Sequence, residues 1–97
     1  MPFEIILAPE AVEDLKGLKA NVRAEVKAAL ERHLRHESGR RSRSRIRRLR
    51  GLRRPQFRLR VGDVRVFHDV SDGAVEVLAI VTKSEAESWL AQFGDRE

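Results

Sequence analysis

The chain has 97 residues, a length typical of a single domain with one modest hydrophobic core. It contains no cysteine, which excludes disulfide bonds, a thiolate nucleophile and zinc held by cysteine. Its apolar runs are far shorter than the ~20 residues that span a bilayer, and residues 1–4 carry no signal-peptide pattern. We therefore expect residues 1–97 to form one soluble, cytoplasmic domain.

Charge is distributed very unevenly along the chain. It carries 20 basic and 15 acidic residues, a net charge of +5. Residues 40–65 contain twelve arginines and one acidic residue, so this window carries +11 and the remainder −6. Such segregation favours a polyanionic partner, because each phosphate that is neutralised releases counterions. The alternative interpretation is a solvated face or a disordered arm.

The first third of the chain predicts a strand followed by two helices. Residues 3–7 are rich in β-forming side chains. Pro9 suits the first turn of a helix that weakens at Gly17. Asn21 is placed to cap a second helix of about sixteen residues that ends near 37–39 and has one apolar stripe. The stripe consists of Val22, Val26, Ala29, Leu30 and Leu34.

The middle of the chain passes from a low-complexity segment into strands. Residues 39–45 consist of glycine, arginine and serine and have the composition of a flexible arm. A short strand is expected within 46–52, before a turn. Over 57–61 the alternation is clear, with apolar side chains on one face and Arg58 and Arg60 on the other. Gly62 and Asp63 then predict a type II′ hairpin turn.

The last third predicts two further strands and a helix. Within residues 64–70 three valines share a face with His68, and 75–81 form an apolar run typical of a central strand. Ser84 and Glu87 have the spacing of a capping box that opens a short C-terminal helix. The order of elements predicts an α+β fold, with a small twisted antiparallel sheet and the N-terminal helical hairpin packed on one face. The other face is then free to carry the arginines.

Three segments of this pattern resemble the RelE/ParE family of toxins from bacterial type II toxin–antitoxin modules. These segments are residues 46–52, 57–70 and 75–80, preceded by the helical hairpin, so the likeness covers nearly the whole chain. The resemblance implies a twisted sheet whose concave face carries the activity. The RelE branch of the family cleaves mRNA in the ribosomal A site. The ParE branch inhibits DNA gyrase by protein contact and lacks the nuclease residues.

The resemblance also implies a set of catalytic and binding residues. Arg58 and Arg60 match the paired basic positions on the family's catalytic strand, and Arg65 matches its phosphate-binding arginine. Arginine suits this role because its planar group donates two hydrogen bonds to phosphate oxygens. Lys83 stands near a position where the family has another cation. The rest of the arginine window is expected to bind RNA: Arg45, Arg47, Arg48, Arg50, Arg53 and Arg54.

The sequence departs from the family pattern where protons are transferred. It contains no tyrosine, and arginine is too basic to act as a general base. His68 is a catalytic candidate because imidazole titrates near neutral pH, although its alternation with valines places it on the packed face. Trp89 lies near the family's aromatic position, but an indole cannot exchange a proton, and its helical spacing favours the core.

The sequence predicts neither a metal nor a cofactor. His33, His36 and Glu37 lie at the end of the second predicted helix, but two histidines without a clear third ligand are a weak metal signal. Basic side chains are also favourable at that end of a helix. No P-loop, dinucleotide-binding fingerprint or nucleophile triad is present.

These features favour a metal-independent, ribosome-associated mRNA endoribonuclease that contacts mRNA and ribosomal RNA and inhibits translation. Two alternatives stay open: a non-nucleolytic toxin that inhibits gyrase, and a degenerate toxin that retains only antitoxin binding. The expected partner is a cognate antitoxin whose acidic C-terminal segment covers the arginines within a hetero-oligomer. No membrane partner is expected.

Overall fold

The computed structural model describes residues 2–36 and 45–97. The predicted arm at 39–45 therefore lies outside the described residues except for Arg45, and so does the predicted end of the second helix at 37–39. No helix in the described ranges is both long enough and apolar enough to cross a membrane.

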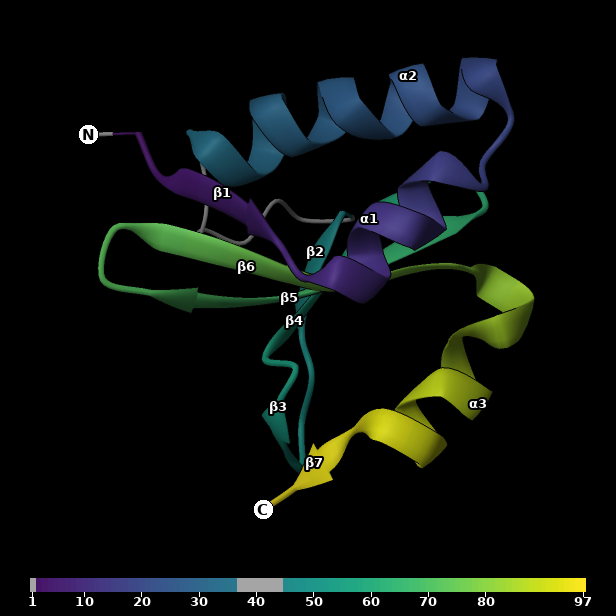
Figure 1. Ribbon diagram of the computed structural model, residues 1–97. Coiled ribbons are helices and arrows are strands. Elements are labelled where there is room, and N and C mark those ends of the chain that lie inside the picture. Colours follow the sequence, from purple (N-terminus) through teal and green to yellow (C-terminus); the bar gives the residue numbers. More distant parts are fainter. Residues whose placement is uncertain (1, 37–44) are drawn as a thin grey trace.

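The fold has three layers, with a sheet in the middle. Helices α1 (Pro9–Lys16) and α2 (Ala20–Ala29) lie on one face of the sheet, and helix α3 (Lys83–Phe93) lies on the opposite side (Figure 1). The N-terminal hairpin on one face is confirmed. The C-terminal helix covers part of the other face, which the sequence did not predict.

Five strands form the sheet, and three of its four strand pairings are antiparallel. The spatial order is β1 (Glu4–Leu7), β6 (Ala74–Thr82), β5 (Val64–Ser71), β4 (Phe57–Val61) and β2 (Ile46–Arg48). Edge strand β1 runs parallel to β6, an exception to the predicted antiparallel sheet. The β4–β5 turn has Gly62 at a φ of +57°, and no other described residue except Gly51 and Gly73 has a positive φ. A positive φ at the first turn position alone is the geometry of the predicted type II′ turn.

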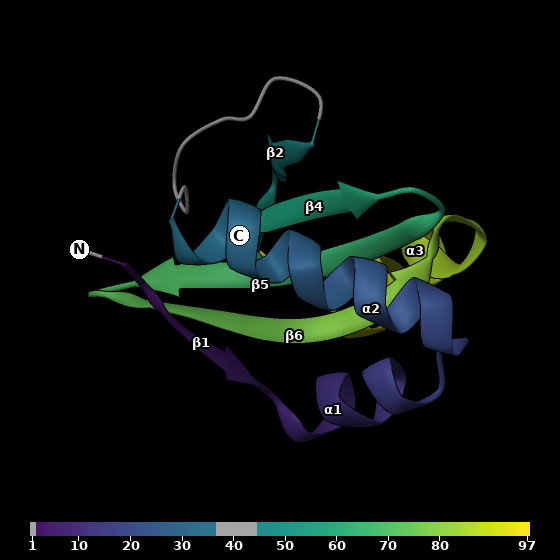
Figure 2. The same ribbon diagram turned by 90° about the horizontal axis from the view of Figure 1, so that it is seen from above.

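Helix α2 begins earlier than the sequence predicted. Helix α2 begins directly after Lys19, so Asn21 is not its N-cap as predicted, and no side chain caps this end. Helix α2 continues into a π-helical segment, η1 (Leu30–Arg35), and passes over the middle of the sheet (Figure 2). The guanidinium group of Arg23 links α2 to α1. It donates hydrogen bonds to carbonyl oxygens at the end of α1 and just after it, those of Leu15, Lys16 and Leu18.

The hydrophobic core lies between this helical layer and the sheet. Leu59, Val66 and Val77 come from three adjacent strands and are fully buried. Val26 and Leu34 contribute from the helical side. Alternate residues of β4 and β5 therefore fill the core, which leaves the intervening residues of the same strands to face the other way.

Helix α3 is fixed at both ends. Its N-cap is Thr82, whose side chain forms a capping box with Glu85, so the predicted box of Ser84 and Glu87 is wrong by two residues. Beyond the helix, β7 (Asp95–Arg96) pairs with β3 (Leu52–Arg54) as a separate two-stranded sheet. The C-terminal end of α3 therefore leads into the β3–β7 pair, on the side of the sheet away from α1 and α2 (Figure 1).

Candidate functional site: an arginine groove between the sheet and α3

Two pairs of arginines lie opposite each other on neighbouring strands, on the face of the sheet that also carries α3. Arg60 of β4 lies directly opposite Arg65 of β5, and Arg58 of β4 lies directly opposite Arg47 of β2. Residues opposite each other in an antiparallel pair share a face, with Cβ atoms about 5 Å apart. The structure therefore brings Arg58, Arg60 and Arg65 together on one face; their catalytic role stays a prediction.

A groove of about 680 Å³ runs between these arginines and α3. Arg47, Arg58 and Arg65 line it from the sheet, and Phe67 lies at its base. From α3, Ser84, Glu87 and Leu90 line the other wall. A smaller hollow of about 390 Å³ shares Arg65 and Lys83 with the groove and adds Arg45 and Arg60. We call the two together the arginine groove.

The arginines differ in how firmly they are held. Arg65 is only 8% exposed, and its Nη1 donates to the carbonyl oxygens of Gly62 and Val64, at 2.8 and 3.1 Å. These bonds fix the side chain against the glycine turn. Arg60 is exposed. The pKa of Arg58 is lowered by burial first and by three neighbouring arginines second, and its buried Nε has no hydrogen-bond partner.

This arrangement has the charge and the free hydrogen-bond donors that an anion would need. A buried guanidinium N–H without a partner costs free energy, and like charges directly opposite each other in a sheet repel. A phosphate diester would supply acceptors and negative charge at the same place. Lys83 is exposed and lines the smaller hollow together with Arg65. Its backbone N–H donates to the carbonyl oxygen of Asp63 at 2.8 Å.

His68 lies in the core, on the face opposite to the arginines. It is 1% exposed, its ring stacks on Phe57 with centroids 5.7 Å apart, and its Nδ1–H donates to the carbonyl oxygen of Val66 at 3.2 Å. Burial lowers the pKa of His68 to about 4, so the ring is neutral at pH 7. The predicted packed position is confirmed. The structure does not bring this side chain to the arginine groove.

The other arginines of the window have several different environments. Arg47 and Arg45 line the arginine groove, Arg53 is exposed on β3, and Arg48 lies over the ring of Phe57, 5.4 Å from its centroid. Arg50 lines a neighbouring hollow of about 460 Å³ that also contains Glu87 and Leu90.

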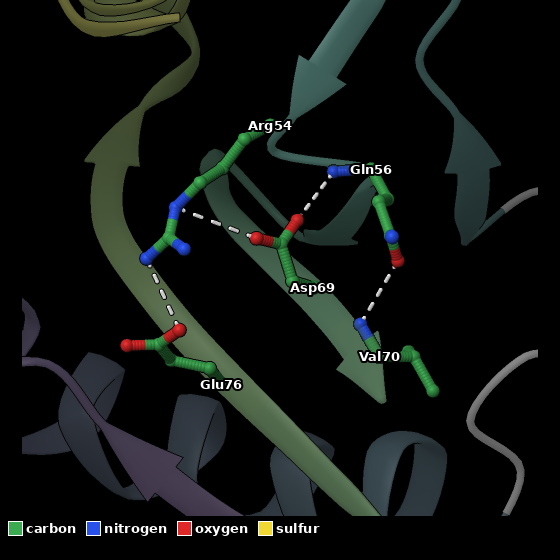
Figure 3. Close-up of polar contacts among 5 residues, drawn as sticks. All are labelled: Arg54, Gln56, Asp69, Val70 and Glu76. Carbon is green, nitrogen blue, oxygen red and sulfur yellow. Dashed lines mark hydrogen bonds and ion pairs between the residues drawn. The ribbon is translucent and has the colours of Figure 1, made fainter. Parts of the chain in front are cut away.

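Arg54 is held by carboxylates and lines a hollow separate from the arginine groove. Its Nη2 donates to Glu76 at 3.1 Å, and its Nε lies 3.5 Å from a carboxylate oxygen of Asp69 (Figure 3). The other oxygen of Asp69 accepts the Gln56 backbone N–H at 2.7 Å, while the Gln56 side chain accepts the N–H of Val70 at 3.0 Å. These contacts indicate a structural role for Arg54, and the RNA contact expected from the sequence stays a prediction.

Sequence reasoning missed Glu87 as a residue of the groove. The pattern Ser-x-x-Glu at 84–87 assigned it to a helix cap, but Thr82 and Glu85 have the same spacing and form the observed cap. Glu87 is therefore not part of the cap, and its side chain is exposed on the surface of α3 that lines the groove. Trp89 stacks on Phe67 with centroids 5.1 Å apart and is half-buried, close to its predicted core position.

A metal site does not form around the histidines of the helical layer. Within residues 2–36 and 45–97, no three His, Cys, Asp or Glu side chains come close enough to hold a metal ion. His33 is half-buried and His36 is exposed at the end of η1, and Glu37 lies outside the described residues.

The three-layer fold is that of RelE toxins of known structure. The chain is similar to RelE in the RelE–RelB complex from Pyrococcus horikoshii, with a TM-score of 0.70 and 21% identity over 86% of this chain and 97% of that one. It is also similar to a mutant of the E. coli toxin RelE in the free state, with a TM-score of 0.68 and 24% identity over 92% of both chains. At these identities the likeness establishes the fold.

The sequence itself matches a family model. Residues 5–87 match the ParE toxin of type II toxin–antitoxin systems, so the chain belongs to this family of toxins. No curated protein matches the chain. The resemblance that the sequence showed to RelE/ParE toxins is therefore confirmed at the level of family and fold.

Proposed function

We propose that this toxin is a metal-independent endoribonuclease that binds mRNA at the ribosome and cleaves it in the arginine groove. The observation that carries the proposal is the pair of cross-strand arginine contacts, Arg60 with Arg65 and Arg47 with Arg58, on a groove open to solvent. Four guanidinium groups on one sheet face match the charge and hydrogen-bonding needs of a phosphodiester.

The chemistry asked of the arginines is stabilisation of charge. When a ribose 2′-oxygen attacks the adjacent phosphorus, negative charge accumulates on the non-bridging oxygens. Preorganised N–H donors stabilise this charge more than the ground state, which lowers the barrier. Arg65 is the best preorganised of the three predicted catalytic arginines because two backbone carbonyls already orient it. Lys83 adds a flexible cation at the same end.

Substitution of the arginines tests this proposal. We expect Arg60→Ala and Arg65→Lys each to lower RNA cleavage by about 10²–10³-fold, because each removes a donor from the phosphate. Cleavage is measured by mapping RNA 5′ ends after induced expression, and growth arrest is followed in the same cultures. The matched control is Arg32→Ala, an exposed arginine of η1 on the opposite face. Wild-type cleavage by both groove variants would contradict the proposal.

A second function, inhibition of gyrase by protein contact, is favoured by one specific observation. None of the described residues that line the groove is a histidine or tyrosine, and His68 is buried elsewhere. Supercoiling by purified gyrase in the presence of the toxin distinguishes the two functions. Intact transcripts together with blocked supercoiling would favour this second function. Normal growth without antitoxin would instead indicate a degenerate toxin.

The partner that we propose is an antitoxin with an acidic segment. The fold is shared with RelE chains that were solved as complexes with RelB from three organisms. The arginine groove offers an acidic segment the same charge that it offers RNA, so antitoxin and RNA are expected to compete. A gene for such an antitoxin is expected next to the toxin gene. If no acidic antitoxin restored growth, this partner would be wrong.

A further inference from the structure

We propose that Glu87 is the general base of the RNA cleavage reaction. The inference rests on the proposed function and supplies the proton acceptor that arginine cannot provide. Glu87 lies on α3, across the groove from the arginines of the sheet, and its side chain is exposed. It lines both the groove and the neighbouring hollow that contains Arg50, so it lies where the two meet.

The contact of α3 with β5 determines which helix surface faces the arginines. Trp89 stacks on Phe67, and Phe67 is the cross-strand partner of Arg58, so the helix is tied to the strand that carries the site. Trp89 and Phe93 turn toward a separate hollow that also contains Leu78. Ser84, Glu87 and Leu90 recur at three-residue intervals and face the groove.

The position of Glu87 across the groove is the one that a base needs. A phosphodiester held by Arg58 and Arg65 on the floor would present its ribose to the opposite wall. Asp63 also lines the groove and the smaller hollow with Arg60, but it belongs to the β4–β5 turn on the sheet side, where its backbone carbonyl accepts the Lys83 N–H. Of the two carboxylates among the described lining residues, Glu87 is thus the one that faces the sheet arginines from α3.

In the proposed step, the ribose 2′-oxygen replaces the 5′-oxygen on phosphorus. The Glu87 carboxylate takes the proton of the ribose 2′-hydroxyl while the 2′-oxygen forms a bond to phosphorus. The bond between phosphorus and the 5′-oxygen breaks, and the leaving 5′-oxygen takes a proton from water. The products are a 2′,3′-cyclic phosphate and a 5′-hydroxyl end. Protonated Glu87 then returns its proton to solvent.

The test is Glu87→Gln, which keeps the shape of the side chain and removes its basicity. A general base contributes about 10²–10⁴-fold, so we expect single-turnover cleavage to fall by at least about 100-fold. RNA affinity should stay equal or rise, because a negative charge beside the phosphate is removed. Glu87→Asp should restore part of the rate. The matched control is Glu25→Gln, the same change at an exposed position of α2 on the far side of the sheet.

The pH profile separates a base from a structural residue. Wild-type cleavage should fall at acidic pH as the base becomes protonated, and Glu87→Gln should lack this decline. Cleavage by Glu87→Gln at the wild-type rate, or a rise of both affinity and rate, would overturn the inference while leaving the nuclease proposal intact. The same holds if Asp63→Asn abolishes cleavage and Glu87→Gln does not. A wild-type protein that cleaves no RNA, with ribosomes present, would overturn both.

Discussion

The placement of Arg60 directly opposite Arg65 lowers the stability of the free protein, whereas the same placement would favour binding of an anion. Like charges directly opposite each other in an antiparallel pair cost up to ~1 kcal/mol, and two such arginine pairs lie side by side here. Local arrangements that oppose stability are typical of functional sites. An anion bound there would relieve the repulsion, so the proposed affinity for phosphate and the destabilisation of the free protein would have the same origin.

His68 illustrates the opposite case, a titratable side chain that serves the core. Because burial lowers its pKa to about 4 in the folded state, the unfolded chain binds a proton first as the pH falls. The stability contributed by the neutral ring is therefore complete above about pH 6.5 and is lost as the pH falls toward about 4.

This pKa difference predicts the pH dependence of folding. The free energy of unfolding should be lower at about pH 5 than at about pH 7.5 by roughly 2 kcal/mol, as measured by urea denaturation. His68→Phe keeps an aromatic ring beside Phe57 and removes the titration, so it should lose this part of the pH dependence. An identical pH dependence in both proteins would assign the effect to other groups.

At the scale of elements, the connection from β3 to β4 is held to β5 by polar contacts. Asp69 accepts the Gln56 backbone N–H, and the Gln56 side chain accepts the Val70 N–H, so each strand satisfies a group of the other (Figure 3). Arg54 joins this cluster to Glu76 on β6. The cluster fixes the beginning of β4, the strand that carries Arg58 and Arg60.

Removal of the Asp69 carboxylate should destabilise this corner of the sheet. We expect Asp69→Ala to lower the free energy of unfolding by about 1–3 kcal/mol, because the partly buried Gln56 N–H loses its acceptor. Asp69→Asn retains an acceptor and should cost less. Denaturant unfolding measures both, with Asp72→Ala in the exposed turn that follows β5 as the control. Equal stability of the Ala variant and the wild type would show that the cluster contributes nothing.

The sequence predicted those elements whose signal is local and periodic. Alternation over 57–61 predicted both strand β4 and the face of its arginines, because a period of two fixes orientation as well as structure. The start of α2 and the cap of α3 were wrong because several polar residues near each helix end have suitable spacing. The parallel pairing of β1 and the side taken by α3 depend on contacts distant in sequence, which periodicity does not report.

The candidate site was predictable to the same extent. The family resemblance indicated Arg58, Arg60 and Arg65, and alternation with the glycine turn placed them on one face, since a hairpin pairs residues at fixed offsets. Glu87 and the carboxylates around Arg54 were not predicted, because they come from elements that meet only in the folded molecule.

At the scale of the whole molecule, basic residues are concentrated in one window of the sequence, and part of that window lines the groove. Residues 40–65 carry +11 and the rest of the chain −6. The groove draws its cations from three strands and the start of α3, so its positive potential is concentrated on one side of the molecule. Such a field accelerates encounter with a polyanion and orients it toward the groove.

This charge distribution predicts a strong dependence of RNA affinity on salt. If about four phosphates of a single strand are neutralised, log affinity should fall against log salt concentration with a slope of roughly −3. Fluorescence anisotropy with a labelled oligoribonucleotide measures this slope. Arg60→Ala should make it shallower by about 0.7, whereas Arg32→Ala should leave it unchanged. A nearly flat dependence for the wild type would mean that the groove is not an RNA-binding surface.

In strand β4, the odd-numbered and even-numbered residues face opposite sides of the sheet and have different roles. Leu59 and Val61 are buried against the helices, while Arg58 and Arg60 point to the far side of the same strand. Replacement of the outward-facing residues therefore leaves the inward-facing ones undisturbed. A scaffold of this kind can acquire a new surface through a few codon changes and still assemble, because its core residues stay the same.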